Sequence, residues 1–67
     1  MIIWMSKHAL EQARERGISI AEIEGTIQCG AKYLQDKNKI VSDYRYIRVV
    51  YKKIENKYFI ITVMLRK

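Results

Sequence analysis

Proline is absent from this chain of 67 residues, which contains one cysteine and one histidine. A lone cysteine excludes an internal disulfide and fits a reducing cytoplasm. One cysteine with one histidine cannot supply the four ligands of a structural zinc site. We interpret Cys29, which has no histidine nearby in the sequence, as a packed thiol rather than a nucleophile. We therefore expect no metal and no cofactor.

Long apolar runs and clustered glycines are also absent. The amino-terminal MIIWM is too short for a secretory signal or a membrane span, so we expect a soluble cytoplasmic protein without membrane contact. The three isolated glycines form no phosphate-binding loop. Residues 1–67 make one domain near the lower size limit for a single core, so a homodimer or another partner chain stays an open alternative.

Positive charge is concentrated in the second part of the chain. Residues 1–30 carry three basic and four acidic side chains, whereas residues 31–67 carry ten basic and three acidic ones. A strongly basic segment of this kind suggests a surface that contacts phosphates. The alternative is ordinary solvation, with lysines protecting the edges of a sheet.

Two short helices are predicted in the first part. Ser6 is a favourable N-cap for a helix over residues 7–16, and a glycine stands where that helix ends. Ser19 and Glu22 form a capping box at the start of a second helix over residues 19–29, which another glycine follows.

The remaining segments predict strands. Residues 2–5 alternate weakly and suit a short edge strand, residues 31–35 suit another, and residues 40–54 and 58–66 alternate as a hairpin. The hairpin loop contains Asn56, which tolerates a left-handed conformation. The predicted fold is α+β, with two short amino-terminal helices packed on a small antiparallel sheet of three or four strands. The residues expected to be buried are Ile20, Ile23, Ile27, Ile47, Val49, Phe59, Ile61, Val63 and Leu65.

Strand alternation gives the hairpin one face covered by the helices and one face free for ligand contact. The covered face carries Ile47, Val49 and Tyr51 on the first strand. The free face is expected to carry Tyr46, Arg48, Val50, Lys52, Tyr58, Ile60, Thr62, Met64 and Arg66.

The single histidine lies in the first turn of the first predicted helix. On an ideal helix, at about 100° per residue, Ala9, Leu10 and Ala13 mark the buried side. His8 lies roughly opposite, near the positive end of the helix dipole, which favours a neutral imidazole. A neutral imidazole can accept a proton as a general base does. The alternative is a solvent-facing histidine with no role.

The chain contains residue types that suit metal-free cleavage of RNA by the RNA's own 2′-hydroxyl group. The reaction needs in-line positioning, a base, a proton donor and cations near the developing phosphorane charge. Aromatic side chains beside cations on a sheet also suit base stacking. Strand propensity alone is the alternative explanation for the tyrosines. The residues of suitable type are His8, Tyr46, Arg48, Tyr58 and Arg66.

The stretch SKHALEQARERGIS and the closing IITV together resemble the small bacterial family known only as domain of unknown function 4258. The resemblance spans nearly the whole chain. Its matched residues are His8-Ala9, Glu11-Gln12, Glu15-Arg16-Gly17-Ile18, Ser19 and Ile61-Thr62-Val63. Gln12 departs from the arginine usual in that family at its position.

That family is grouped with the RelE-like and BrnT-like toxins. The resemblance implies two helices on a small antiparallel sheet, ribonuclease activity, and restraint by an antitoxin protein. The site that it implies consists of His8, Arg16, Arg48 and Thr62.

The leading interpretation is a metal-free, RNA-binding endoribonuclease that acts as the toxin of a toxin–antitoxin pair. His8 would be the base or acid, and the cations would contact phosphate. The alternatives are a non-catalytic nucleic-acid-binding module, and a protein-interaction domain whose basic face meets an acidic antitoxin or a second copy of the chain. The expected nucleic-acid contacts beyond the implied site are Tyr46, Lys52, Tyr58 and Arg66.

Overall fold

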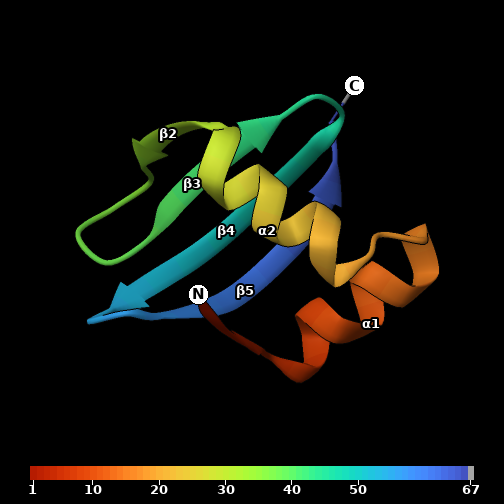
Figure 1. Ribbon diagram of the computed structural model, residues 1–67, viewed down its shortest axis with the longest axis horizontal. Coiled ribbons are helices and arrows are strands. Elements are labelled where there is room, and N and C mark those ends of the chain that lie inside the picture. The colour runs from red at the N-terminus through yellow and green to blue at the C-terminus, as the bar shows by residue number, and fades with distance from the viewer. Residues whose placement is uncertain (67) are drawn as a thin grey trace.

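The computed structural model describes residues 1–66, which form two helices and five strands (Figure 1). The strands form a single sheet in the order β1-β5-β4-β3-β2. No helix in the described part of the chain is long and apolar enough to cross a membrane. The elements are β1 (Ile2–Met5), α1 (Lys7–Arg16), α2 (Ile20–Cys29), β2 (Ala31–Leu34), β3 (Ile40–Tyr44), β4 (Ile47–Ile54) and β5 (Lys57–Leu65).

The α+β class and the short strand at residues 2–5 are confirmed, but the predicted arrangement of the sheet is wrong in two respects. The sheet has five strands and is mixed, because β1 pairs with β5 in parallel while the other neighbours pair antiparallel. The helices also do not come first, since β1 precedes them. Two parallel neighbouring strands must be joined by a connection that returns the chain to the same end of the sheet. Here α1, α2, β2, β3 and β4 together make up the connection from β1 to β5.

Local capping explains both helices. The Ser6 hydroxyl accepts a hydrogen bond from the Ala9 N–H at 3.0 Å, and Gly17 ends α1 in the left-handed conformation with φ 67°. The predicted capping box of Ser19 and Glu22 is present, with each side chain bonded to the other residue's backbone N–H. The helix boundaries therefore agree with the prediction to within one residue.

Gly30 follows α2 for a steric reason. Its backbone is extended, with φ −74° and ψ 161°, so the left-handed region is not what requires glycine here. An added Cβ atom would meet the carbonyl oxygen of Thr26, the hydroxyl of Ser42 at 2.6 Å and the carbonyl oxygen of Asp43 at 2.7 Å. The absence of a side chain thus lets the end of α2 lie directly against β3.

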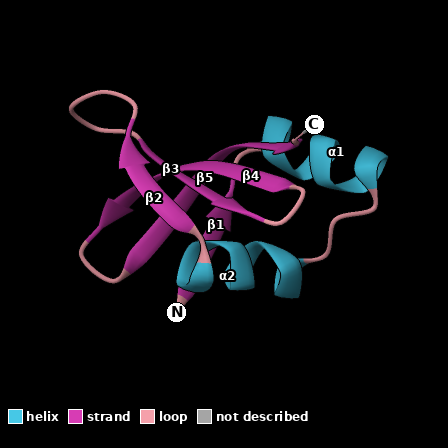
Figure 2. Ribbon diagram, turned by 90° about the horizontal axis from the view of Figure 1, so that it is seen from above, coloured by secondary structure: helices cyan, strands magenta, loops and turns pink. Residues whose placement is uncertain are grey.

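Both helices contribute to one core on the same face of the sheet. Figures 1 and 2 show α2 lying across β3 and β4 and α1 lying beside β5. Burial is confirmed for Ile23, Ile27, Ile47, Val49 and Val63. The core cluster is made of Ala9, Ala13, Ile18, Ile23, Ile27, Ile47, Val49, Tyr51, Ile60 and Val63.

The prediction of burial was wrong for other residues. Ile20 and Leu65, each 47% exposed, lie at the ends of their elements, where fewer side chains cover them. Phe59 is 39% exposed and Ile61 is only half-buried. Cys29, interpreted from the sequence as packed, is exposed at the last residue of α2.

A bulge in β5 explains the error at Phe59. Val50 pairs with Thr62, but the next residue, Tyr51, pairs with Ile60, so Ile61 is the extra residue. A shift of one residue moves every following side chain to the other face. Ile60 is therefore in the core, and Phe59 is outside it.

The segment 40–54 is not one strand, as was predicted, but two. β3 and β4 are joined by a tight turn in which Arg45 has φ 56°. The β4–β5 turn likewise has its left-handed residue at Glu55, with φ 58°, and not at Asn56. Neither position carries a residue that favours this conformation, so the turn at Arg45 left no signal in the sequence.

Candidate nucleic-acid interface

The sheet leaves one face free of helices. The hydroxyl of Ser42 donates to the Thr26 carbonyl of α2 at 2.6 Å, so Ser42 and its partner Val49 point toward the helices. Their neighbours along β3 and β4 must point the other way, because strand side chains alternate. We call this helix-free side the open face. Its strand residues are Ile2, Trp4, Ala31, Tyr33, Val41, Asp43, Arg48, Val50, Lys52, Ile54, Lys57, Phe59, Thr62 and Met64.

Two predicted arginines meet at one carboxylate on the open face. Arg48 makes a bidentate pair with Asp43, with its Nε atom 2.7 Å from Oδ1 and its Nη2 atom 3.0 Å from Oδ2. The Nε atom of Arg66 lies 3.7 Å from the same Oδ2. The hydrogen bonds from Arg48 hold the pKa of Asp43 below its usual value. Two cations share one anion, so the cluster keeps net positive charge.

Exposed apolar side chains gather at the other end of the open face. Trp4, Ile54, Lys57 and Phe59, which we call the Trp4 patch, line a depression of about 260 Å³. Trp4 is 58% exposed, and the Lys57 Nζ atom lies 5.8 Å from the centre of its ring. Exposed aromatic rings beside lysines are the arrangement that stacks bases. Sequence reasoning missed Trp4 and placed Phe59 in the core.

The other predicted nucleic-acid contacts are dispersed. Lys52 and Thr62 lie on the open face, as expected. Tyr46 lies in the β3–β4 turn and donates its hydroxyl to Glu22 Oε2 at 2.8 Å, which raises the pKa of the tyrosine. Tyr58 was expected on the free face, but the bulge places it on the helix face, with its ring centre 5.7 Å from that of Tyr51.

The remaining implied catalytic residues lie at the two ends of α1. His8 is exposed in its first turn, and Arg16 is exposed at its last residue. α1 packs on β5 and β1, whereas Arg48 belongs to β4. Within residues 1–66, no hydrogen bond or ion pair joins His8 to Arg16, Arg48 or Thr62.

On α1, the side chain of Gln12 makes a direct contact with β5. Its side-chain Oε1 atom accepts a hydrogen bond from the backbone N–H of Val63 at 3.1 Å. β1 pairs with β5 only as far as Ile60, so this N–H lies on the strand edge that β1 leaves free. Gln12 therefore continues the edge pairing of β5 with a side chain. Gln12, where the resemblance had led us to expect arginine, therefore has a structural role here.

We predict that Gln12→Arg lowers the free energy of unfolding by about 1–3 kcal/mol, because arginine has no acceptor for the backbone N–H of the buried Val63. Gln12→Glu retains an acceptor and serves as the matched control. Urea denaturation of the three proteins measures the difference. Equal loss in both variants would show that the hydrogen bond is not the cause.

Among residues 1–66, no three His, Cys, Asp or Glu side chains lie close enough together to hold a metal ion. The arrangement instead offers cations and aromatic rings on a free sheet face, with an imidazole on the neighbouring helix.

No curated protein and no solved structure matches the chain. A family model described as a domain of unknown function, DUF4258, matches residues 5–65. The match includes both helices and four of the strands, together with the residues on which the sequence resemblance was based. The chain therefore belongs to the DUF4258 family.

Proposed function

We propose that the protein binds single-stranded RNA on the open face of its sheet. The observation that carries this proposal is the Trp4 patch, where two exposed aromatic rings lie beside Lys57 on a helix-free surface. Stacking of a base on an aromatic ring contributes about 1–3 kcal/mol and tolerates any base. The free edges of unpaired bases make single-stranded RNA the natural ligand for such a surface.

Charge on the same face supports a path for the phosphate backbone. Lys52 is the cross-strand partner of Phe59, and the cluster of Arg48, Arg66 and Asp43 lies farther along β4. Asp43 is the one acidic residue of the open face as defined above, so the face is net positive. A strand of RNA on this face can place bases at the Trp4 patch and phosphates near these cations.

The catalytic part of the proposal rests on His8 and on the family resemblance. His8 is exposed on α1, and Gln12, one helical turn further, touches β5. An RNA that leaves the open face across the edge of β5 passes this side of α1, where an imidazole can accept the 2′-hydroxyl proton. Under this proposal the protein is a toxin, and an acidic antitoxin restrains it by covering the positive face.

We predict that RNA affinity falls as salt rises and that the double variant Lys52→Ala/Lys57→Ala flattens this dependence. For single strands the logarithmic slope is about −0.7 per neutralised phosphate, so two lost contacts reduce it by about 1.4. Trp4→Ala is expected to weaken binding by about tenfold through lost stacking. Fluorescence anisotropy with a labelled oligonucleotide measures both effects.

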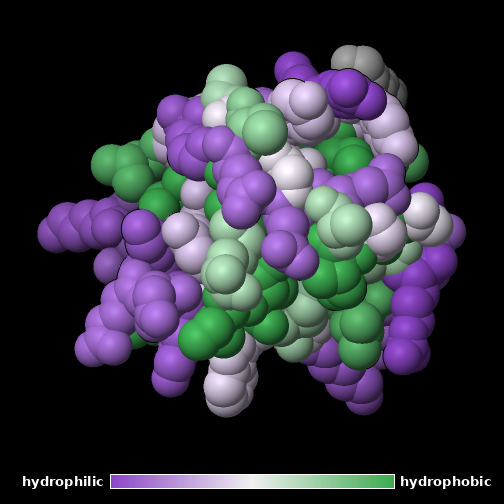
Figure 3. All heavy atoms as spheres, viewed as in Figure 1, coloured by the Kyte–Doolittle hydropathy of each residue, from purple (hydrophilic) through white to green (hydrophobic). Residues whose placement is uncertain are grey.

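Lys37→Ala, in the loop between β2 and β3, is the control for general loss of charge. Figure 3 shows hydrophilic side chains extending from this loop and from the β4–β5 turn. The control should bind RNA like the parent protein. If no RNA binds even at low salt, the proposal fails and the protein-interaction alternative replaces it.

A further inference from the structure

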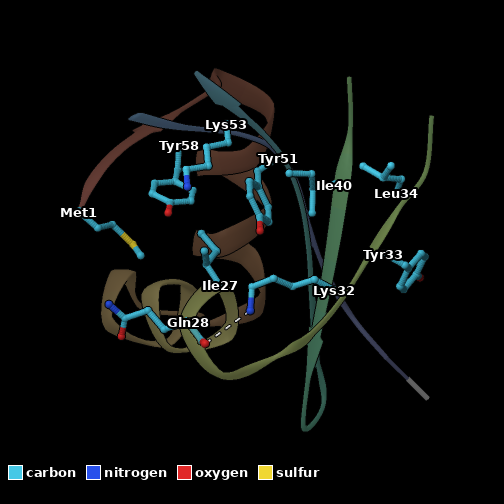
Figure 4. A pocket seen from close by; sticks show the side chains of 10 residues that line it. All are labelled: Met1, Ile27, Gln28, Lys32, Tyr33, Leu34, Ile40, Tyr51, Lys53 and Tyr58. Atoms are coloured by element: carbon cyan, nitrogen blue, oxygen red, sulfur yellow. Dashed lines mark hydrogen bonds between the residues drawn. The ribbon is translucent and has the colours of Figure 1, made fainter. Parts of the chain in front are cut away.

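A second candidate site lies on the helix face, away from the open face. A pocket of about 520 Å³ opens between the carboxyl-terminal end of α2 and the sheet, next to the last residues of β4 and the first residues of β5 (Figure 4). Its apolar wall includes Ile27 and Ile40, and the rings of Tyr51 and Tyr58 line it as well. Its size is within the range of about 300–1,000 Å³ that is typical of small-molecule sites. We call it the tyrosine pocket.

The hydroxyl of Tyr51 is an unused donor in this pocket. The residue is only 2% exposed, and within residues 1–66 its hydroxyl makes no hydrogen bond. No side-chain oxygen or nitrogen in that range is both fully buried and unpaired, so the exposed part of Tyr51 includes its hydroxyl. Figure 4 shows the hydroxyls of Tyr51 and Tyr58 both pointing toward Ile27. Burial raises the pKa of Tyr51, which keeps the phenol protonated and able to donate.

The charged groups of the tyrosine pocket all have one sign. Lys32 and Lys53 line it, and no aspartate or glutamate in the described chain does. The Lys32 Nζ atom donates to the carbonyls of Gln28 and Gly30, at 3.4 and 3.1 Å, which fixes it at the rim and leaves one of its three donors unused. The Lys53 Nζ atom lies 5.5 Å from the centre of the Tyr58 ring.

We propose that the tyrosine pocket binds a small organic anion, an aromatic carboxylate or phosphate monoester. Its apolar body lies against Ile27 and Ile40, and its anionic group accepts hydrogen bonds from the Tyr51 hydroxyl and the Lys53 ammonium. Apolar walls with a few converging donors and two unopposed cations match this chemistry and disfavour cationic ligands. The site is separate from the proposed RNA surface, because Tyr51, Lys53 and Tyr58 project from the other side of the sheet. Of the residues that line the pocket, only Tyr33 belongs to the open face.

The test is a titration of the ¹⁵N-labelled protein with benzoate, phenyl phosphate and the neutral analogue benzyl alcohol, followed by NMR. The two anions are expected to shift the amide signals of Ile27, Lys32 and Tyr51, and benzyl alcohol to bind at least about tenfold more weakly. The stronger of the two anions identifies the preferred anionic group. Equal binding of the neutral analogue, or no binding by either anion at millimolar concentration, would overturn the proposal.

Two variants locate the site. Tyr51→Phe removes only the hydroxyl and should weaken anion binding by about tenfold, the loss of one hydrogen bond to a charged group. Lys53→Gln should weaken it by about fivefold. Lys57→Gln, on the open face of the same hairpin, is the control and should leave anion binding in the tyrosine pocket unchanged. Unchanged affinity in Tyr51→Phe, or signal shifts centred on Trp4 and Phe59, would assign the binding elsewhere and refute the pocket.

Discussion

Replacing Gly30 with alanine is expected to lower the free energy of unfolding by about 3 kcal/mol, a large share of the stability of a domain this small. The new methyl group would meet the Thr26 carbonyl, the Ser42 hydroxyl and the Asp43 carbonyl at once. Two of these three are backbone atoms in α2 and β3, which cannot rotate away. Relief requires α2 to separate from β3, which would also break the buried hydrogen bond from Ser42 to Thr26.

Gly25→Ala is the matched control, because a Cβ atom at Gly25 meets nothing within 4 Å. Alanine in the interior of α2 should stabilise the protein by about 0.5–1 kcal/mol. Urea denaturation of the two variants and the parent protein measures both the expected loss and the expected gain in the free energy of unfolding. If Gly30→Ala is as stable as Gly25→Ala, the close approach of α2 to β3 is not a constraint on the fold.

The second large effect concerns catalysis and rests on the proposed function. His8→Ala is expected to reduce the rate of RNA cleavage by about 10²–10⁴-fold, the usual contribution of a general base. The stability of the fold should change by less than about 0.5 kcal/mol, since His8 is exposed. RNA affinity should also persist, because the open face is unaltered. The measurement is a cleavage assay with purified protein in the presence of a chelator.

Glu11→Ala, an exposed residue one turn along α1, is the control for changes to the helix surface and should cleave like the parent. Equal rates for the parent and His8→Ala would leave the histidine as a surface residue without chemistry. Binding without any cleavage by the parent protein would favour the non-catalytic module over the ribonuclease.

The parts of the fold that depend on contacts between residues close together in the sequence could be predicted. Ser6, Ser19 and Glu22 satisfy backbone donors within three residues of themselves, so their sequence spacing predicts both helix starts. The bulge at Ile61 was not predictable in this way. It exists only as a relation between β5 and the strand beside it, and alternation along either strand alone gives no sign of it.

The candidate site shows the same difference between features that are local in the sequence and features that depend on long-range pairing. Composition and alternation predicted that Arg48 and Lys52 share a free face, and β4 places them there. Asp43 was missed because the turn at Arg45 was missed, and only that turn brings its carboxylate beside Arg48. Trp4 was missed because only the pairing of β1 with β5 places it beside Phe59, and these two strands are far apart in the sequence.

Because β5 lies between β1 and β4, β1 is synthesised well before β5, the strand with which it pairs. During translation, Ala9 and Ala13 on α1 therefore lack the strand that covers them, since α1 packs mainly on β5. Pairs that close such long loops form late and slow the search for the native state. The nascent chain thus keeps an uncovered apolar helix face until residues 57–65 leave the ribosome, and a chaperone or partner chain could contact it in that interval.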